Sequence, residues 1–142
     1  AQKNGYKKIL ILEDDAIFSK NFMPMFQNIK KLKSWKILYL GASQHDWSNI
    51  EYLEHFYLAK KSAGTFAYAL DCSVYDDVLK EHNDDYTIDF NLSAIQEKYN
   101  TESFVFYPNI VISNVEKSSI REKRDQHNHG LDMKWNITEY EY

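Results

Sequence analysis

Cysteine, proline and glycine are scarce in this chain, whose 142 residues include one cysteine, two prolines and four glycines. With a single cysteine no intramolecular disulfide can form, and Cys72, beside an apolar run, is expected to be an inert core thiol. No apolar run approaches the roughly 18 residues of a membrane span, and no signal peptide is visible. We therefore expect a soluble, cytoplasmic protein with no membrane span.

A net positive charge is also lacking. The formal net charge is −4, which argues against nucleic acid as the main partner. Apolar residues make up 44% of the chain and charged residues 27%, as in soluble globular proteins. We expect one compact domain over residues 1–142, with its core over 5–121 and a polar C-terminal tail over 114–142. Lysine outnumbers arginine 15 to 2, a bias typical of AT-rich bacterial or viral genomes.

Strand and helix patterns alternate along the chain and indicate an α/β fold. Residues 8–12 and 36–40 are short continuous apolar runs, typical of strands buried on both faces in a parallel sheet. Between them, apolar residues recur every three or four positions over 19–33, which predicts an amphipathic helix. A strand–helix–strand unit favours a parallel pair with a right-handed crossover. Further strands are expected at 52–58, 64–70, 104–107 and 110–112, and further helices at 72–81 and 88–99.

Three consecutive acids, Glu13, Asp14 and Asp15, directly follow the first apolar run. In open α/β sheets, ligands bind at the carboxyl ends of the strands, and three adjacent carboxylates repel one another unless something offsets the repulsion. A divalent cation with a diphosphate would do so, because Mg²⁺ and Mn²⁺ take one or two carboxylates and complete their shell with phosphate oxygens and waters. Alternatively, Asp14 or Asp15 caps the following helix and interacts favourably with its dipole.

The segment ILILEDDAIF at residues 9–18 resembles the metal-binding strand of GT-A glycosyltransferases, most of all glycosyltransferase family 25. That family includes lipooligosaccharide and procollagen sugar transferases. Further segments resemble it in the same order: ILYLG at 37–41, AGTFAYAL at 63–70, TIDF at 87–90 against a Pro-x-Asp segment, and Pro108 with SSIR at 118–121. The resemblance spans residues 5–121. It implies a GT-A-like (Rossmann-like) α/β fold with a mixed, mostly parallel sheet flanked by helices.

The resemblance also implies a role for the acids and for a glycine-containing strand entry. Asp15, with Glu13 as a second candidate ligand, would bind Mn²⁺ or Mg²⁺. Glu13 and Asp14 would otherwise act through metal-bound water, the ribose or the donor sugar. The metal would hold the diphosphate of a UDP-sugar and stabilise the UDP leaving group as a Lewis acid. Gly64 and Thr65 would let the backbone approach the donor sugar, although Gly64 is equally compatible with a simple strand entry.

GT-A enzymes often take another metal ligand near the C-terminus, commonly a histidine, which makes His127 and His129 the candidates. On an extended segment the two imidazoles of a His-x-His pair can lie on one side, but a solvent-facing polar tail is equally compatible. An inverting transfer needs a base that deprotonates the acceptor hydroxyl. Asp89 matches the family's acid in this region and is our candidate for the base or an acceptor-binding residue. Alternatively, it caps the helix that follows.

Two other polar residues belong with these candidates. His45 follows the second apolar run and is expected at the same edge of the sheet as the acids. Arg124 is a candidate for a phosphate contact, although a solvated run of charges also explains it.

Members of this family carry a further N-terminal segment, with the first strand and part of the nucleotide pocket, that this chain lacks. Uridine recognition would then come from residues 1–8, from the tail or from a partner subunit, and the last option motivates a homodimer hypothesis. We expect a metal-dependent transferase that moves galactose or glucose from a UDP-sugar to a hydroxyl of a saccharide or a hydroxylated protein. Two alternatives are a non-catalytic sugar- or partner-binding remnant and a small metal-dependent phosphohydrolase.

Overall fold

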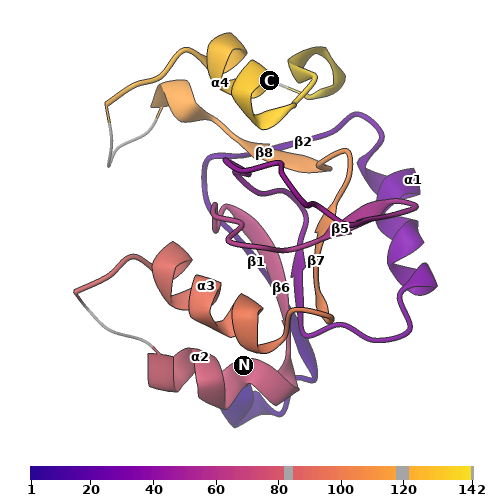
Figure 1. The fold of residues 1–142 in the computed structure, drawn as a ribbon, viewed down its shortest axis with the longest axis vertical. Coiled ribbons are helices and arrows are strands. Elements are labelled where there is room, and N and C mark those ends of the chain that lie inside the picture. Colours follow the sequence, from indigo (N-terminus) through magenta and orange to yellow (C-terminus); the bar gives the residue numbers. More distant parts are fainter. Residues whose placement is uncertain (82–84, 118–121, 142) are drawn as a thin grey trace.

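The computed structural model describes residues 1–81, 85–117 and 122–141. Within them the strands are β1 (Lys8–Leu12), β2 (Ala16–Phe18), β3 (Ile37–Tyr39), β4 (Tyr52–Leu53), β5 (Phe56–Leu58), β6 (Ala67–Asp71), β7 (Ser103–Phe106) and β8 (Val111–Ser113). The α-helices are α1 (Phe22–Phe26), α2 (Tyr75–Glu81), α3 (Ile88–Lys98) and α4 (Gln126–Met133). The short 3-10 helices are η1 (Gln2–Asn4), η2 (Gln27–Lys31), η3 (Cys72–Val74), η4 (Val115–Lys117) and η5 (Ile137–Glu139). Figure 1 shows α2 and α3 on one side of the sheet, α1 on the other, and α4 beyond β2 and β8.

The fold is mixed α/β, but its main sheet is mostly antiparallel, so the predicted mostly parallel sheet is wrong. The described strands lie in the order β1-β6-β3-β7-β5-β4, and β3 with β7 is the parallel pair. Strand β6 is antiparallel to both β1 and β3, and β5 is antiparallel to both β7 and β4. The two strands expected to form a parallel pair, β1 and β3, do run in the same direction, but β6 lies between them.

The course of the chain after β3 explains this topology. The chain leaves β3, forms the β4–β5 hairpin at the far edge, and returns to the end of β3, where Ser43 and Ala63 form an antiparallel bridge. Strand β6 therefore starts where β3 stops and runs back beside it. Helices α2 and α3 then provide the crossover that parallel strands require, and β7 enters parallel to β3.

Strand β1 lies at the edge of the sheet, so the predicted burial of this strand on both faces is wrong. Ile9 and Ile11 pack against buried core residues, whereas Leu10 and Leu12 are 45% and 44% exposed. A continuous apolar run reports that both faces of a strand are hydrophobic. It does not report whether a second element covers each face.

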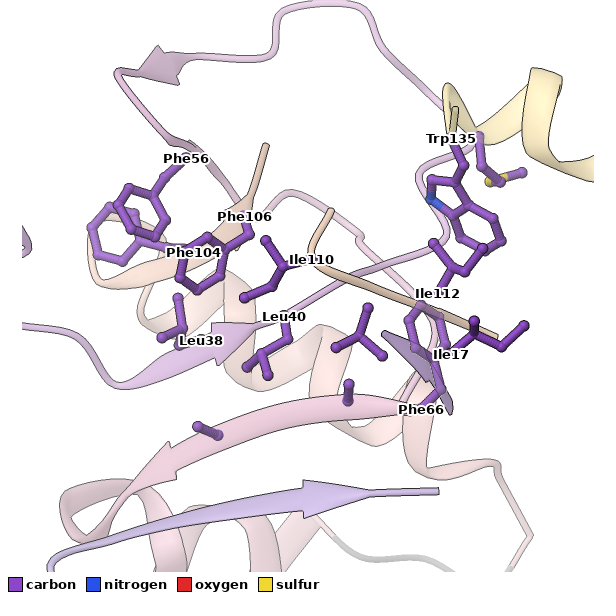
Figure 2. Packing of buried hydrophobic residues seen from close by; sticks show 14 of the residues in the cluster. Ile17, Leu38, Leu40, Phe56, Phe66, Phe104, Phe106, Ile110, Ile112 and Trp135 are labelled. Atoms are coloured by element: carbon purple, nitrogen blue, oxygen red, sulfur yellow. The ribbon is translucent and has the colours of Figure 1, made fainter. Parts of the chain in front are cut away.

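Two clusters of apolar side chains bury the two faces of the sheet. Along β3, Ile37 and Tyr39 belong to the cluster on the side of α2 and α3, whereas Leu38 and Leu40 belong to the other. The second predicted strand is therefore buried on both faces, as expected. Figure 2 shows how the second cluster continues from Phe104 and Phe106 of β7 past the end of the sheet, through Ile110, Ile112, Ile17, Phe66 and Trp135.

The C-terminal segment packs on this core although its composition is polar from residue 114 onward. Met133, Trp135 and Tyr140 are at most 5% exposed. The indole N–H of Trp135 donates a hydrogen bond to the Asn109 side-chain oxygen, and the Tyr140 hydroxyl donates to the Asn109 carbonyl at 2.7 Å. Three large side chains thus fix a segment whose remaining residues are mostly hydrophilic, and they hold α4 beside β2 and β8 (Figure 1).

The helix predicted over residues 19–33 is divided in two. Helix α1 follows Asn21 and holds Pro24 in its first turn, a position that tolerates proline, and the chain then continues as η2. None of the helices in the described part of the chain is both long enough and apolar enough to cross a membrane.

Candidate functional site

The three acids occupy a turn between two strands, and no helix follows them directly. Ala16–Phe18 forms β2, which pairs with β8, and the residue before α1 is Asn21. The alternative that Asp14 or Asp15 caps the following helix is therefore wrong. Backbone hydrogen bonds hold the turn at both ends: the Glu13 N–H donates to the Phe66 carbonyl at 2.9 Å, and the Asn114 N–H donates to the Asp15 carbonyl at 2.9 Å.

A cleft of about 290 Å³ opens at this end of the main sheet. The sheet contributes residues that follow β1, follow β3 and precede β6, while the start of α3 forms a second wall and the segment from β8 to α4 a third. The lining residues are Glu13, Asp15, Ser43, His45, Ala63, Gly64, Thr65, Phe66, Thr87, Ile88, Asp89, Ser113, Val115, Glu122, Arg124 and His129. Most of the predicted site residues therefore share one cavity, although they come from four separate parts of the chain.

Two hydrogen bonds connect the predicted residues in pairs. The Thr65 hydroxyl donates to Glu13 Oε1 at 2.7 Å, and the Gly64 N–H donates to Asp89 Oδ1 at 3.0 Å. Gly64 has a φ of +91°, and a Cβ at this position would collide with the Phe66 ring. Both the backbone conformation and the packing therefore require glycine here, which a simple strand entry would not. Asp89 lies in the first turn of α3, whose N-cap residue is Thr87. Its carboxylate is directed toward the sheet.

The cleft is dominated by negative charge. Glu13, Asp15, Asp89 and Glu122 contribute four carboxylates, against the single guanidinium of Arg124 among the described lining residues. Burial raises the pKa of Asp15, and the negative charges of Glu13 and Asp14 raise it further. One carboxylate oxygen of Asp15, Oδ1, is buried and has no hydrogen-bond partner within the described part of the chain. A cation in the cleft would offset both the repulsion and the missing contact.

The Tyr68 hydroxyl interacts electrostatically with two of these carboxylates. Burial raises the pKa of the Tyr68 hydroxyl, and the charges of Glu13 and Asp89 add to the increase. The phenol is therefore neutral at physiological pH and lies within electrostatic reach of both acids. Its ring also packs near that of Tyr39, with 6.2 Å between the centroids.

A buried network of neutral polar groups supports the wall behind the cleft. The Gln96 side-chain amide donates to the Tyr39 hydroxyl and to the Ser62 carbonyl, both at 2.7 Å, and its oxygen accepts from the Ser62 N–H at 3.0 Å. The Ser62 hydroxyl in turn donates to Gln44 Oε1 at 2.7 Å. This network ties α3 to the two segments that carry Ser43 and Gly64 into the cleft.

The two candidate histidines lie in different environments because they belong to a helix. Residues two apart in an α-helix point in nearly opposite directions, so the arrangement expected for an extended segment does not apply to α4. His129 is 7% exposed and lines the cleft. Its ring packs edge-on against that of Trp135, with 5.1 Å between the ring centroids. His127 is exposed and does not line the cleft.

Other residues complete the description of the cleft. Asp14 is exposed and is absent from the lining, whereas Glu122 and Ser43 reach the cleft although their local sequence contains no signal for it. His45 and Arg124 lie in the cleft and also in an adjoining hollow of about 640 Å³ beside α4. The segment at 118–121, which carries part of the family resemblance, lies outside the described residues.

The residues present are compatible with a bound Mg²⁺ or Mn²⁺. Among the described residues, no group of three or more His, Cys, Asp or Glu side chains is arranged to hold a metal ion by itself. Such ions in phosphate sites usually take only one or two carboxylates, with phosphate and water as the other ligands. The buried Oδ1 of Asp15, which has no partner among the described residues, is the kind of ligand that such a site requires.

No protein-family model, no curated protein and no solved structure matches this chain. The function proposed below therefore depends on the geometry of the cleft together with the resemblance of its residues to GT-A glycosyltransferases.

Proposed function

We propose that this domain is a metal-dependent glycosyltransferase that moves a hexose, galactose or glucose, from a UDP-sugar to a hydroxyl group of a saccharide or a hydroxylated protein. The observation that carries the proposal is the Asp15 carboxylate. It is half-buried, it has a raised pKa, and its Oδ1 is unpartnered among the described residues, inside a cleft that also holds Glu13 and Asp89. A charged carboxylate in this environment destabilises the folded protein unless a bound ligand interacts with it.

Donor binding is assigned to the sheet side of the cleft. When bound, a Mn²⁺ or Mg²⁺ ion supplies a Lewis acid that stabilises the diphosphate leaving group. Asp15 would hold this ion, with His129 as a candidate ligand from α4, and Arg124 would offer its guanidinium to a phosphate oxygen. Glu13 is oriented by the Thr65 hydroxyl at 2.7 Å and accepts hydrogen bonds from a donor hydroxyl or a metal-bound water.

Asp89 is the proposed base for the acceptor. The Gly64 N–H fixes the orientation of its carboxylate from across the cleft. In an inverting transfer, the acceptor oxygen forms a bond to the anomeric carbon while the bond from that carbon to the diphosphate oxygen breaks. The acceptor proton moves to the Asp89 carboxylate, and UDP leaves with the bonding electron pair.

Calorimetric binding of UDP, with and without Mn²⁺, tests this function. We expect Mn²⁺-dependent binding to the wild type and a loss of affinity of at least about 100-fold in Asp15→Ala. Asp76→Ala is the matched control, because Asp76 is an exposed carboxylate on α2 that accepts a hydrogen bond from Gln2. Failure of the wild type to bind UDP with Mn²⁺ and, in a parallel titration, with Mg²⁺ would contradict the proposal.

Product analysis separates the proposed function from its two alternatives. Release of UDP from a UDP-sugar that disappears in Asp15→Ala excludes a non-catalytic remnant. Release of inorganic phosphate from simple phosphoesters, without UDP release from UDP-sugars, identifies a phosphohydrolase instead.

A further inference from the structure

Two large aromatic side chains are exposed next to Asp89. The rings of Tyr86 and Phe90 stack on each other, with 4.7 Å between their centroids and 21° between their planes. Tyr86 is nevertheless 54% exposed and Phe90 60% exposed. Stacking covers one face of each ring, so a large flat apolar surface stays in contact with water. Neither residue belongs to the two apolar clusters that form the core.

This aromatic pair flanks cleft-lining residues in the sequence. Thr87, Ile88 and Asp89 line the cleft, and Tyr86 and Phe90 are the residues immediately before and after these three. The hydrogen bond from Gly64 fixes the Asp89 carboxylate against the sheet. The pair therefore lies at the same end of α3 as the residues that line the cleft, and this end faces the segment between β8 and α4 (Figure 1).

An apolar surface beside a carboxylate has the two features that recognise a sugar ring. One face of a pyranose presents C–H groups, which pack on an aromatic ring and remove apolar surface from water. Its edge presents hydroxyl groups, which donate hydrogen bonds to a carboxylate. A hydroxylated amino-acid side chain has no comparable flat face to cover the two rings.

We propose that Tyr86 and Phe90 form the acceptor subsite, and that the acceptor is a saccharide whose ring stacks on this pair while one hydroxyl is directed toward Asp89. This inference rests on the proposed function, because it assigns the acceptor of the same site. It selects a saccharide over a hydroxylated protein. It also makes the aromatic pair a determinant of acceptor affinity, with donor binding left to the sheet side of the cleft.

Acceptor kinetics with Phe90→Ala test the inference. The assay measures transfer from UDP-galactose and UDP-glucose, with Mn²⁺, to lactose, to methyl galactoside and to a hydroxylysine peptide. We expect the variant to raise the KM for the saccharide about tenfold with a smaller change in kcat, and Phe90→Tyr to restore most of the affinity. Leu79→Ala is the matched control, because Leu79 is an apolar residue of α2 that is 63% exposed and its neighbours in the sequence, unlike those that precede Phe90, do not line the cleft.

Two results would overturn the inference while the proposed function stands. One is an unchanged saccharide KM in both Phe90→Ala and Tyr86→Ala, and the other is transfer to the hydroxylysine peptide alone. Calorimetry of UDP with Mn²⁺ is run on every variant. If the wild type itself does not bind UDP, the proposed function is contradicted. In that case saccharide titrations followed by NMR decide the inference, which stands if Phe90→Ala weakens binding and fails if it does not.

Discussion

The two ends of the β1–β6 pair carry the same type of residue in opposite states. At one end, Asp71 closes β6 and accepts three hydrogen bonds: from Lys8 Nζ at 2.9 Å, from the Ser73 N–H at 3.0 Å and from the Ser73 hydroxyl at 2.6 Å. Burial alone would raise the pKa of this carboxyl, but these hydrogen bonds and the Lys8 charge outweigh it and lower the pKa to about 2. The folded state therefore stabilises the Asp71 charge.

At the other end, Asp15 is half-buried among like charges. Burial raises its pKa first, and Glu13 and Asp14 raise it further. Its Oδ1 has no hydrogen-bond partner in the described part of the chain. The comparison teaches that this fold can stabilise a charged carboxylate at the end of a strand, as it does for Asp71, but disfavours the charge of Asp15 at the opposite end. Groups held in unfavourable states without a local compensation are expected at functional sites.

The largest effect is expected from Gly41→Ala, which would disturb the packing at the cleft end of the sheet. The Ile110 N–H donates to the Leu40 carbonyl at 2.8 Å, and this contact brings the start of β8 against the end of β3. A Cβ on residue 41 would collide with the Val111 carbonyl oxygen. We expect a loss of about 3 kcal/mol or more in the free energy of unfolding, measured by urea denaturation, because backbone cannot move aside as a flexible side chain can.

Gly5→Ala provides the control for Gly41→Ala. Gly5 has a φ of +69°, but a Cβ there meets no atom within 4 Å. Only the left-handed backbone is then strained, at about 1 kcal/mol. Equal losses in the two variants would show that the close approach at Gly41 does not hold β8 over the end of the sheet.

Much of the fold could be predicted from local patterns. The apolar runs and the 3.6-residue periodicity located β1, β3, α2 and α3 to within a few residues. The direction of β6 could not be predicted, because it depends on the Ser43–Ala63 bridge that returns the chain to the end of β3. The exposure of Leu10 and Leu12 could not be predicted either, since it depends on whether another element covers that face of β1.

The candidate site was predictable where its residues sit at strand ends and turns. Glu13, Asp15 and Gly64 belong to such positions, and the structure brings them together with Asp89. The different environments of His127 and His129 could be predicted only if their segment was known to be helical, and its polar composition gave no sign of a helix. A helix there depends on the burial of Trp135 and its neighbours at long range.

A smaller effect is expected from Asp71→Asn, which removes the stabilised charge and keeps the shape. The folded-state pKa of about 2 lies below the ordinary value of 3.8. The contribution of Asp71 is therefore present above pH 4 and is lost as the pH falls toward 2. Because this carboxylate is 22% exposed, we expect a loss of about 1 to 2 kcal/mol at pH 7, shrinking toward zero near pH 2.

Urea denaturation of the wild type and Asp71→Asn between pH 2 and pH 7 measures this difference, with Asp76→Asn as the exposed control. A loss that stays constant with pH would contradict the assignment, because it would show that the charge of Asp71 is not what stabilises this end of the β1–β6 pair.

The smallest and most informative effect is expected from the same substitution at the opposite end. A raised folded-state pKa means that the charged Asp15 carboxylate opposes folding, and this cost grows as the pH rises through the folded-state value. Asp15→Asn should therefore stabilise the metal-free protein at pH 7, by less than about 1 kcal/mol. The gain should vanish below the ordinary pKa of 3.8, where the carboxyl is protonated in both states.

Mn²⁺ should reverse the order of stability of the wild type and Asp15→Asn. If the proposed function holds, the ion would bind the folded wild type through the Asp15 carboxylate and raise its melting temperature, whereas Asp15→Asn has no charge to offer and should not respond. Thermal melts with and without Mn²⁺ measure both effects in one experiment. If Asp15→Asn destabilises the metal-free protein, then Asp15 has a structural partner like that of Asp71, and the contrast between the two ends of the β1–β6 pair disappears.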